Sequence, residues 1–295
     1  LLMTLMICEN FWKHLSSNMI YIKTKEEIRI IKEGGKRLAI ILRRLVKELK
    51  PGVSTAHIEE IFEQSVREIG GLPAFKNYPM GDGIFFPSGV CVSINNEVVH
   101  GAALPERIIK EGDIVDLDIG MEWPINKEER EKYNYPTNPH SQHGGYFTDT
   151  CLTVPAGKIS KEARKLLNVT RLSLTEAIKA AGPGKCLNDI ARAITKVVDK
   201  YNYGIVRDLV GHGVGYFAHE APDVFNFVIK DNSAENIILE PGMVIAIEPM
   251  INSGDWRVKI ADNGYTILTA DGSLSAHFEH TVAITETGVE ILTSL

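Results

Sequence analysis

Four carboxylates lie in apolar, strand-like stretches of the sequence, where an acidic side chain is costly unless it is paired or binds a metal. Asp118 lies in DIVDLDIG, Asp149 in YFTDTCLTV, Glu248 in MVIAIEPM and Glu279 in AHFEHTVAI. Because strand residues alternate between faces, Asp118 shares one face with Asp116 while their apolar neighbours take the other. Buried carboxylates repel one another, and a pair of divalent cations is the simplest way to neutralise them.

The stretch LVGHGVGYFAHEAP, residues 209–222, adds the histidines His212 and His219 among three glycines. Four carboxylates with one imidazole, from His212 or alternatively His219, suit Mn, Fe, Co or Zn better than a thiolate site does. Two metals bridged by carboxylates can lower the pKa of a water and polarise a carbonyl, which is hydrolytic chemistry. The glycines leave room for substrate or backbone to approach closely.

Each of these residues taken alone is better explained as a salt-bridged, surface or hydrogen-bonded core residue, and only the whole set favours a metal site. Other catalytic motifs are absent, because GHGVG is not GxGxxG, HEAPD is not HExxH and no GxSxG occurs. Cys91 has no CxxC partner, which favours a core or pocket-lining role. His140 and His143 lie in a polar stretch and are expected to be solvated.

Helical spacing of apolar residues predicts a long amphipathic helix from Thr24, as N-cap, to Lys50, and a second helix over 54–69 capped by Ser54 or Thr55. The segment 50–70 resembles 182–202, which favours a duplicated α+β half with a site between the halves. Strands are predicted at 89–101, 113–123, 145–157, 242–251, 264–272 and 275–293. The charged stretch 124–144 has almost nothing to bury and is predicted to be a long surface loop that joins a hairpin.

Composition limits the function classes. The net charge of -6 and pI near 5.9 give no general attraction to nucleic acid or to anionic membranes. The four cysteines lie far apart, which suits a reducing cytoplasm. The opening LLMTLMIC is too short to span a bilayer and is a poor signal peptide, and Met19 is the favoured natural start, with 1–18 as an extension that is disordered or not native.

In order along the chain, VSINNEVVHG, DIVDLDIG, YFTDT, GHGVGYFAHEAP, GMVIAIEPM and SLSAHFEHT resemble the site motifs of type I methionine aminopeptidases. The match covers residues 24–290. This resemblance implies an α+β pita-bread (creatinase/aminopeptidase) fold, in which two pseudo-symmetric halves surround a curved, mainly antiparallel sheet. It implies a single catalytic domain over 19–295, with 124–144 as a surface insertion, because the spacing from Asp118 to Asp149 exceeds that of the usual family hairpin.

The resemblance also implies the roles of individual residues. The implied metal ligands are Asp118, Asp149, His212, Glu248 and Glu279, with Asp149 and Glu279 bridging both ions. His100 and His219 are then substrate contacts and catalytic groups, with His219 near the scissile carbonyl and His100 near the scissile nitrogen. A water between the metals is the implied nucleophile, and we choose Glu248 as its proton acceptor.

The resemblance suggests an apolar methionine pocket that involves Cys91, Phe86 and Tyr265. His277 shares a face with Glu279 and is a candidate substrate contact, although a role behind the ligands is favoured.

The expected function is therefore removal of the initiator methionine from nascent polypeptides with a small second residue, by a cytoplasmic hydrolase. The expected cofactors are two divalent ions among Mn, Fe, Co and Zn. The expected partners are nascent N-termini and the ribosome near the exit tunnel, with no nucleic-acid specificity, no membrane and a monomeric state.

Two alternatives stay open. An Xaa-Pro aminopeptidase or prolidase of the same fold is disfavoured by the lack of a further N-terminal domain and by His280, which stands where those enzymes carry an acidic residue. A non-catalytic pita-bread binding protein is disfavoured by the complete ligand set.

Overall fold

The computed structural model describes residues 19–81 and 83–294. The predicted N-terminal extension 1–18 lies outside these ranges. The helices are α2 (Lys25–Glu48), α3 (Thr55–Glu68), α4 (Lys127–Tyr133), α5 (Lys161–Ala180), α6 (Leu187–Val198) and the 3-10 helix η1 (Asp199–Tyr201).

The strands of the first half are short except for one long hairpin. They are β1 (Leu72–Pro73), β2 (Pro79–Gly81), β3 (Ile84–Phe85), β4 (Val90–Ile94), β5 (Glu97–Val99), β6 (Ile114–Trp123) and β7 (Tyr146–Pro155). The second half contains β8 (Gly204–Ile205), β9 (Gly211–Gly213), β10 (Glu220–Val224), β11 (Val244–Ile247), β12 (Met250–Asn252), β13 (Val258–Ile260), β14 (Ile267–Thr269), β15 (Ser275–His277), β16 (His280–Thr285) and β17 (Gly288–Ile291).

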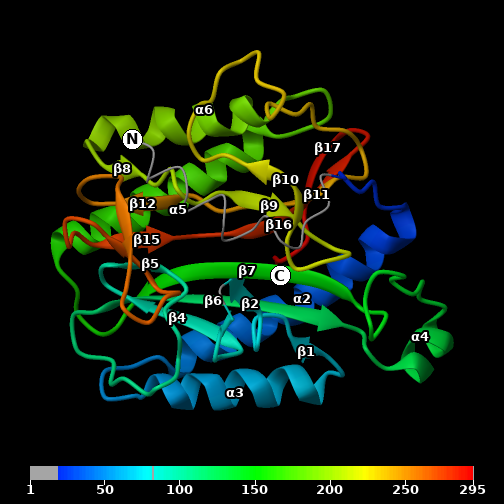
Figure 1. Ribbon diagram of the computed structural model, residues 1–295, viewed down its shortest axis with the longest axis horizontal. Helices are drawn as coiled ribbons and strands as arrows, with labels where there is room; N and C mark the ends of the chain where they lie inside the picture. The colour runs from blue at the N-terminus through cyan, green and yellow to red at the C-terminus, as the bar shows by residue number, and fades with distance from the viewer. Residues whose placement is uncertain (1–18, 82, 295) are drawn as a thin grey trace.

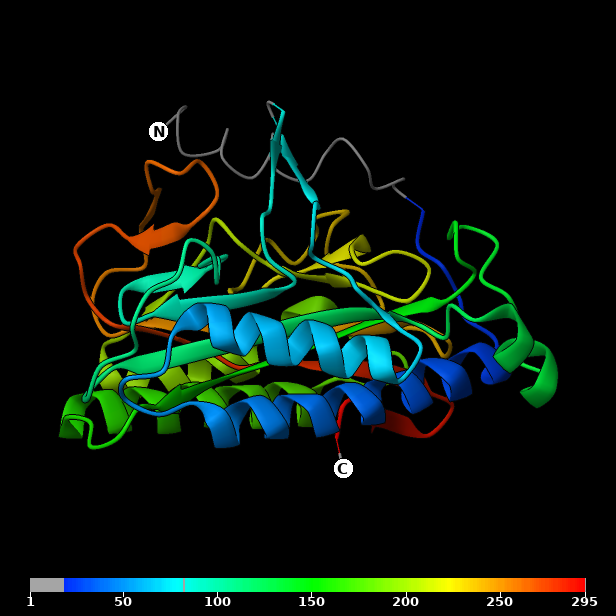
Figure 2. The same ribbon diagram turned by 90° about the horizontal axis from the view of Figure 1, so that it is seen from below.

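These helices and strands form two α+β halves, and each half contains a pair of helices. Figure 1 shows α2 and α3 with β4, β6 and β7 in one half, and α5 and α6 with β9, β11, β15 and β16 in the other. The halves meet where β7 runs beside β16, and Leu152 forms a bridge with Phe278 there. In Figure 2 the helices α2 and α5 lie along one side of the sheets, and the β2–β3 hairpin projects from the other side.

The helix predictions are confirmed at their capped ends. The Thr24 side chain accepts from the Glu27 amide, and the Glu27 carboxylate accepts from the Thr24 amide, which forms a capping box at the start of α2. The Ser54 side chain caps α3 by accepting from the amide of His57. Residues 50–70 and 182–202, which resemble each other in sequence, contribute the second helix of each pair, α3 and α6.

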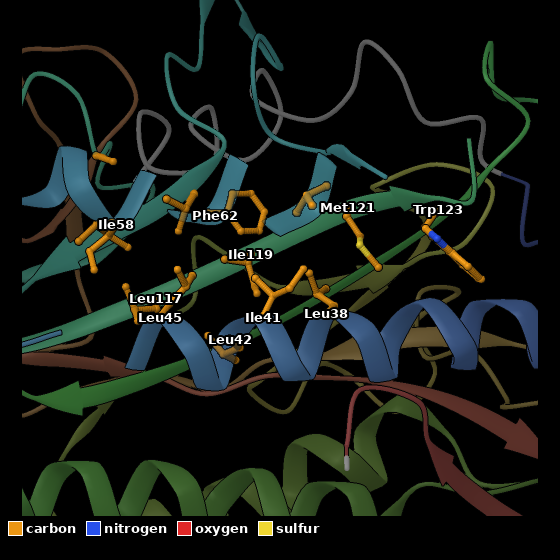
Figure 3. Packing of buried hydrophobic residues seen from close by; sticks show 14 of the residues in the cluster. Leu38, Ile41, Leu42, Leu45, Ile58, Phe62, Leu117, Ile119, Met121 and Trp123 are labelled. Atoms are coloured by element: carbon orange, nitrogen blue, oxygen red, sulfur yellow. The ribbon is translucent and has the colours of Figure 1, made fainter. Parts of the chain in front are cut away.

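The face alternation of β6 orients Asp116 and Asp118. Leu117, Ile119 and Met121 pack against the apolar faces of α2 and α3, as Figure 3 shows. All three side chains are fully buried. Because the intervening residues project the opposite way, Asp116 and Asp118 face away from the helices. The apolar core therefore directs the acidic side chains toward the second half of the molecule.

Three of the predicted strand segments are divided, and the first of them, 89–101, forms β4 and β5. Segments 242–251 and 275–293 are each divided, so that Glu248 lies between β11 and β12, and Glu279 lies between β15 and β16. Pro249 has no N–H to donate to a ladder, which accounts for the first break. The named ladders are antiparallel, as expected, but they form five sheets of four, five, three, three and two strands. Glu248 and Glu279 therefore lie outside the named strands, and the pairing of a continuous strand does not constrain them.

The stretch 124–144 also differs from the predicted loop. It contains α4, which begins after Asn126, whose side chain accepts from the amides of Glu128 and Glu129. Arg130 and Asn138 are buried, with 8% and 1% of their surface exposed. His140 and His143 are exposed. Hydrogen bonds within the segment provide the order that its few apolar residues cannot. No helix in the described part of the chain is long and apolar enough to cross a membrane.

Candidate metal centre

The first half supplies two aspartates on one face of the β6–β7 hairpin. Asp118 pairs with Cys151, and Asp149 pairs with Gly120, so the two aspartates lie two positions apart along the hairpin. Paired residues share a face of a sheet, which brings both carboxylates to the side turned away from α2. The Thr281 hydroxyl donates to Oδ1 of Asp149 at 2.9 Å, which fixes one oxygen of that carboxylate.

The second half supplies the imidazole and the two glutamates. Nε2 of His212 lies 3.4 Å from Oδ2 of Asp149 and 3.4 Å from Oε1 of Glu248. Asp149, His212 and Glu279 each offer a ligand atom, and these atoms all lie within 4.8 Å of one another. Residues from both halves therefore converge on one volume that an ion can occupy.

The glycines beside His212 allow neighbouring backbone to pack closely against β9. A Cβ at Gly211 would lie 2.4 Å from the carbonyl oxygen of Ala246, and one at Gly213 would lie 2.3 Å from that of Ala221. Either contact is shorter than atoms tolerate, so β9 can lie this near its neighbours only with glycine there. The sequence left open whether substrate or backbone would use the space, and the neighbouring backbone does at these two positions.

A cavity of about 70 Å³ lies between the halves. The predicted ligands and all three predicted site histidines line it. These residues are His100, Asp118, Asp149, His212, His219, Glu248, His277 and Glu279. The structure thus brings together residues that are spread over most of the chain.

The acidic cluster is electrostatically unfavourable without a cation. Burial raises the pKa of Glu279 well above its usual range, and the charge of Asp149 raises it further. Burial likewise raises the pKa of Asp149, although His212 opposes the shift. The pKa of Asp118 is raised well above normal, first by burial and then by neighbouring carboxylates, against an opposing effect of His277. A divalent cation would reverse these shifts and hold the carboxylates ionised. The donor set therefore fits divalent metal.

Burial keeps His100 and His219 neutral. Burial lowers the pKa of His219 well below its usual range, and His212 and His100 lower it further. Burial also lowers the pKa of His100 to about 4. His100 has a positive φ of 58°, a conformation that non-glycine residues seldom adopt and that is often found at functional sites. Both rings can therefore act as neutral hydrogen-bonding groups.

Tyr78 was not identified from the sequence. Its hydroxyl oxygen lies 3.0 Å from Nδ1 of His219, and the two rings form an edge contact. Burial raises the pKa of Tyr78, so the phenol keeps its proton and can donate to the imidazole. Only the folded chain reveals this pair, because the two residues are far apart in sequence and Tyr78 lies in no recognisable motif.

Asp116 was noted as a neighbour of Asp118 but was given no role. Its Oδ2 lies 3.5 Å from Nδ1 of His277, whose Nε2 lies 3.3 Å from Oε2 of Glu248. His277 is almost completely buried, with 1% of its surface exposed. Burial lowers its pKa, but Asp116 and Glu248 outweigh this effect and raise the pKa well above normal. Asp116, Cys151 and His277 also offer ligand atoms within 4.8 Å of one another. His277 therefore lies between Asp116 and the Glu248 carboxylate and contacts both.

An apolar recess adjoins the cavity on the side of Asp118. Phe86 and Cys91 line it, and Tyr265 packs edge-on against Phe86 with 5.6 Å between the ring centroids. The sequence did not identify Phe75 or Met80, which belong to the same apolar cluster. This recess joins the expected pocket residues to the acidic cavity.

Comparison with known proteins agrees with this geometry. The family model of metallopeptidase family M24 matches residues 29–125 and 140–286. Methionine aminopeptidase 1 of Bacillus subtilis is 40% identical over 276 residues, which are 93% of this chain and 99% of that protein. The methionine aminopeptidase of Aquifex aeolicus is 41% identical over 278 residues, which cover 94% and 99% of the two chains.

Solved structures extend the likeness to three dimensions. The crystal structure of methionine aminopeptidase from Thermotoga maritima is 38% identical, covers 94% of this chain and 100% of that one, and gives a TM-score of 0.81. Prolidase from Pyrococcus furiosus is 23% identical, with a TM-score of 0.65, and 65% of its length is matched. The latter likeness concerns the fold alone. Together these similarities confirm the expected α+β pita-bread fold.

Proposed function

The chain belongs to metallopeptidase family M24 and, within it, to the methionine aminopeptidases, and from this premise we propose that its acidic cavity holds two divalent metal ions. The protein is a metal-dependent methionyl aminopeptidase, a hydrolase of the peptide bond that removes the initiator methionine. The proposed ligands are Asp118, Asp149, His212, Glu248 and Glu279, with Asp149 and Glu279 shared by both ions.

One observation carries the proposal: two halves of the chain place the four carboxylates and the His212 imidazole of the proposed ligand set around a single cavity. Three of these carboxyl groups have pKa values raised by burial, which is unfavourable unless cations are present. Carboxylate and imidazole ligands suit Mn, Fe, Co and Zn, and the choice among them depends on supply as well as on geometry.

When bound, such ions polarise a carbonyl and lower the pKa of water. The protein supplies the remaining groups. The Tyr78 hydroxyl can donate to Nδ1 of His219, which leaves Nε2 of that ring as an N–H donor for the negative charge that develops on the scissile carbonyl oxygen. His100 lines the same cavity and is assigned to the scissile nitrogen. Glu248 is the assigned proton acceptor, and His277 holds its other oxygen.

The apolar recess is the proposed methionine pocket. Phe86, Cys91 and Tyr265 lie within or beside it, and an unbranched thioether side chain suits such an aromatic lining. We propose a small second residue for the substrate, because the cavity that adjoins the recess has a volume of only about 70 Å³.

We further propose that the protein acts in the cytoplasm on nascent chains, as a monomer near the ribosomal exit tunnel. The described cysteines Cys91, Cys151 and Cys186 are free thiols, which agrees with a reducing compartment. Residues 19–295 are proposed to form one catalytic domain with an insertion at 124–144. The family model omits residues 126–139, within that stretch.

A peptide assay tests the activity. Metal-free protein is given Mn, Fe, Co or Zn in turn, with Met-Ala-Ser, Met-Pro-Gly, Leu-Ala-Ser and Ala-Pro-Gly as substrates. Metal-dependent release of methionine alone is expected. Release of alanine from Ala-Pro-Gly would assign the protein to the proline-specific relatives, and no release with any metal would favour a binding protein.

A further inference from the structure

The segment 124–144 is anchored firmly to the rest of the fold. The amide of Ile125 donates to the carbonyl oxygen of Gly70 at 3.1 Å, just after the end of α3. Trp123 contacts the ring of Tyr135 with 5.8 Å between centroids. The Glu122 carboxylate accepts from the hydroxyl of Ser141 and, where the chain enters β7, from the amide of Gly145 at 3.0 Å. These contacts hold both ends of the segment.

Asn138 connects this segment to the loop 214–219, which ends at His219. Its Nδ2 donates to the carbonyl oxygen of Gly145 at 2.7 Å and to that of Tyr216 at 2.9 Å. Its Oδ1 accepts from the amide of His140 at 2.9 Å. With 1% of its surface exposed, Asn138 uses both side-chain polar atoms in a buried position. A buried amide satisfied in this way restricts the backbone on both sides of the contact.

His140 makes a second, independent contact with the same loop. Its ring lies 5.0 Å from the ring of Tyr216 and 5.5 Å from that of Phe217, measured between centroids. Tyr21 completes the group at 5.2 Å from His140. Aromatic contacts of this kind add packing to the hydrogen bond made by Asn138.

The far side of the loop is held by the protein core. The amide of Phe147 in β7 donates to the carbonyl oxygen of Gly215 at 2.8 Å. The Glu220 carboxylate accepts from the amides of Tyr216 and Phe217 at 3.2 and 3.3 Å. The segment 124–144 adds the contacts of Asn138 and His140 to those that already hold this loop. The loop ends at His219, whose ring centroid lies 4.2 Å from that of His212.

We propose that the segment 124–144 is a positioning element for His219, acting through Asn138 and His140 on the backbone of Tyr216 and Phe217. This inference rests on the proposed function of His219. It assigns no substrate contact to the segment. Because the placement of a catalytic donor affects the rate far more than it affects substrate affinity, the effect should fall on kcat.

Two variants test the proposal, Asn138→Ala and His140→Ala, in the metal-loaded protein. Each is expected to lower kcat on Met-Ala-Ser, by about tenfold to a hundredfold for Asn138→Ala and less for His140→Ala, with KM and metal content unchanged. Amide hydrogen exchange in 215–219 should become faster in both variants. This second readout does not depend on activity, so it tests the inference even if the proposed reaction is wrong.

Two controls isolate the effect. His143→Ala alters an exposed residue of the same segment and should match the wild type in both readouts. Val198→Ala removes apolar volume from a buried position in the hydrophobic core of the second half, and it should lower Tm without touching the loop. The proposal is overturned if Asn138→Ala keeps wild-type kcat and exchange, or if Val198→Ala at equal loss of Tm reduces kcat as much.

Discussion

Nε2 of His277 lies 3.3 Å from Oε2 of Glu248, while Oε1 of the same carboxylate faces Nε2 of His212 at 3.4 Å. The two oxygens of Glu248 are thus divided between a buried imidazole behind the site and the volume where ions are proposed to bind. A partner that holds one oxygen of a ligand orients the other, and loss of such partners commonly costs about 10- to 100-fold in metal affinity or activity.

Replacement of His277 should show this effect directly. His277→Leu removes the N–H directed at Glu248 and should lower kcat by about 10- to 100-fold. His277→Gln keeps one N–H donor and should recover part of the loss. Steady-state kinetics with a methionyl peptide would distinguish the two variants, and equal losses in both would argue against a donor role.

Cys151→Ser provides the matched control for the same cluster. Because the thiol lies beside Asp116 and His277 without a proposed role, the variant should keep both the metal content and the activity of the wild type. A loss of one metal equivalent on this substitution would instead assign Asp116, Cys151 and His277 as ligands of an ion.

His219→Ala should separate transition-state stabilisation from metal binding. The ring is proposed to donate to the developing oxyanion, so its removal should lower kcat by about a hundredfold or more. Metal content, measured by elemental analysis, should be unchanged. Loss of metal together with activity would show that His219 is a ligand.

Tyr78→Phe should reproduce part of this loss. It removes only the hydroxyl that contacts Nδ1 of His219, so a smaller fall in kcat is expected, with little change in KM. A kcat equal to that of the wild type would mean that the hydroxyl does not set the orientation or the tautomer of the ring.

The metal-free protein should lose stability as the pH rises, because the pKa values of three carboxyl groups are raised in the folded state. Asp118, Asp149 and Glu279 hold protons in the folded state at pH values where the unfolded chain has lost them. Their contribution to stability is therefore present below the ordinary values of 3.8 for Asp and 4.5 for Glu, and is lost as the pH rises through the folded-state values.

Denaturant unfolding with and without Mn²⁺ checks this sign. As the pH rises above the ordinary values of 3.8 for Asp and 4.5 for Glu, the free energy of unfolding should fall more steeply for the metal-free protein than for the loaded one, because bound cations keep these groups ionised. Parallel pH dependence in the two forms would contradict the assignment of these carboxylates to the metals.

The sequence predicted the parts of the fold that local patterns encode. Helix α2 begins with the capping box of Thr24 and Glu27, whose residue types and spacing are visible in the sequence. The alternation along β6 likewise separates Asp118 from the apolar residues that pack on α2. Local periodicity is sufficient in both cases, because each residue acts through near neighbours in the chain.

Other features depend on contacts between distant segments. Tyr78 meets His219, and Asn138 meets Tyr216, across separations that no short pattern records. The polar composition of 124–144 suggested a solvated loop, since composition reports what a segment can bury and not which hydrogen bonds it will make. The break between β11 and β12, at Glu248 and Pro249, was missed although Pro249 offered the signal.

We propose that Asp118, Asp149, His212, Glu248 and Glu279 together hold two divalent ions. Anomalous diffraction from crystals of the full chain grown with Mn²⁺ locates such ions directly. We predict two anomalous peaks in the cavity, with Asp149 and Glu279 within bonding distance of both. A single peak, or peaks bound by other residues such as Asp116, Cys151 and His277, would contradict the account.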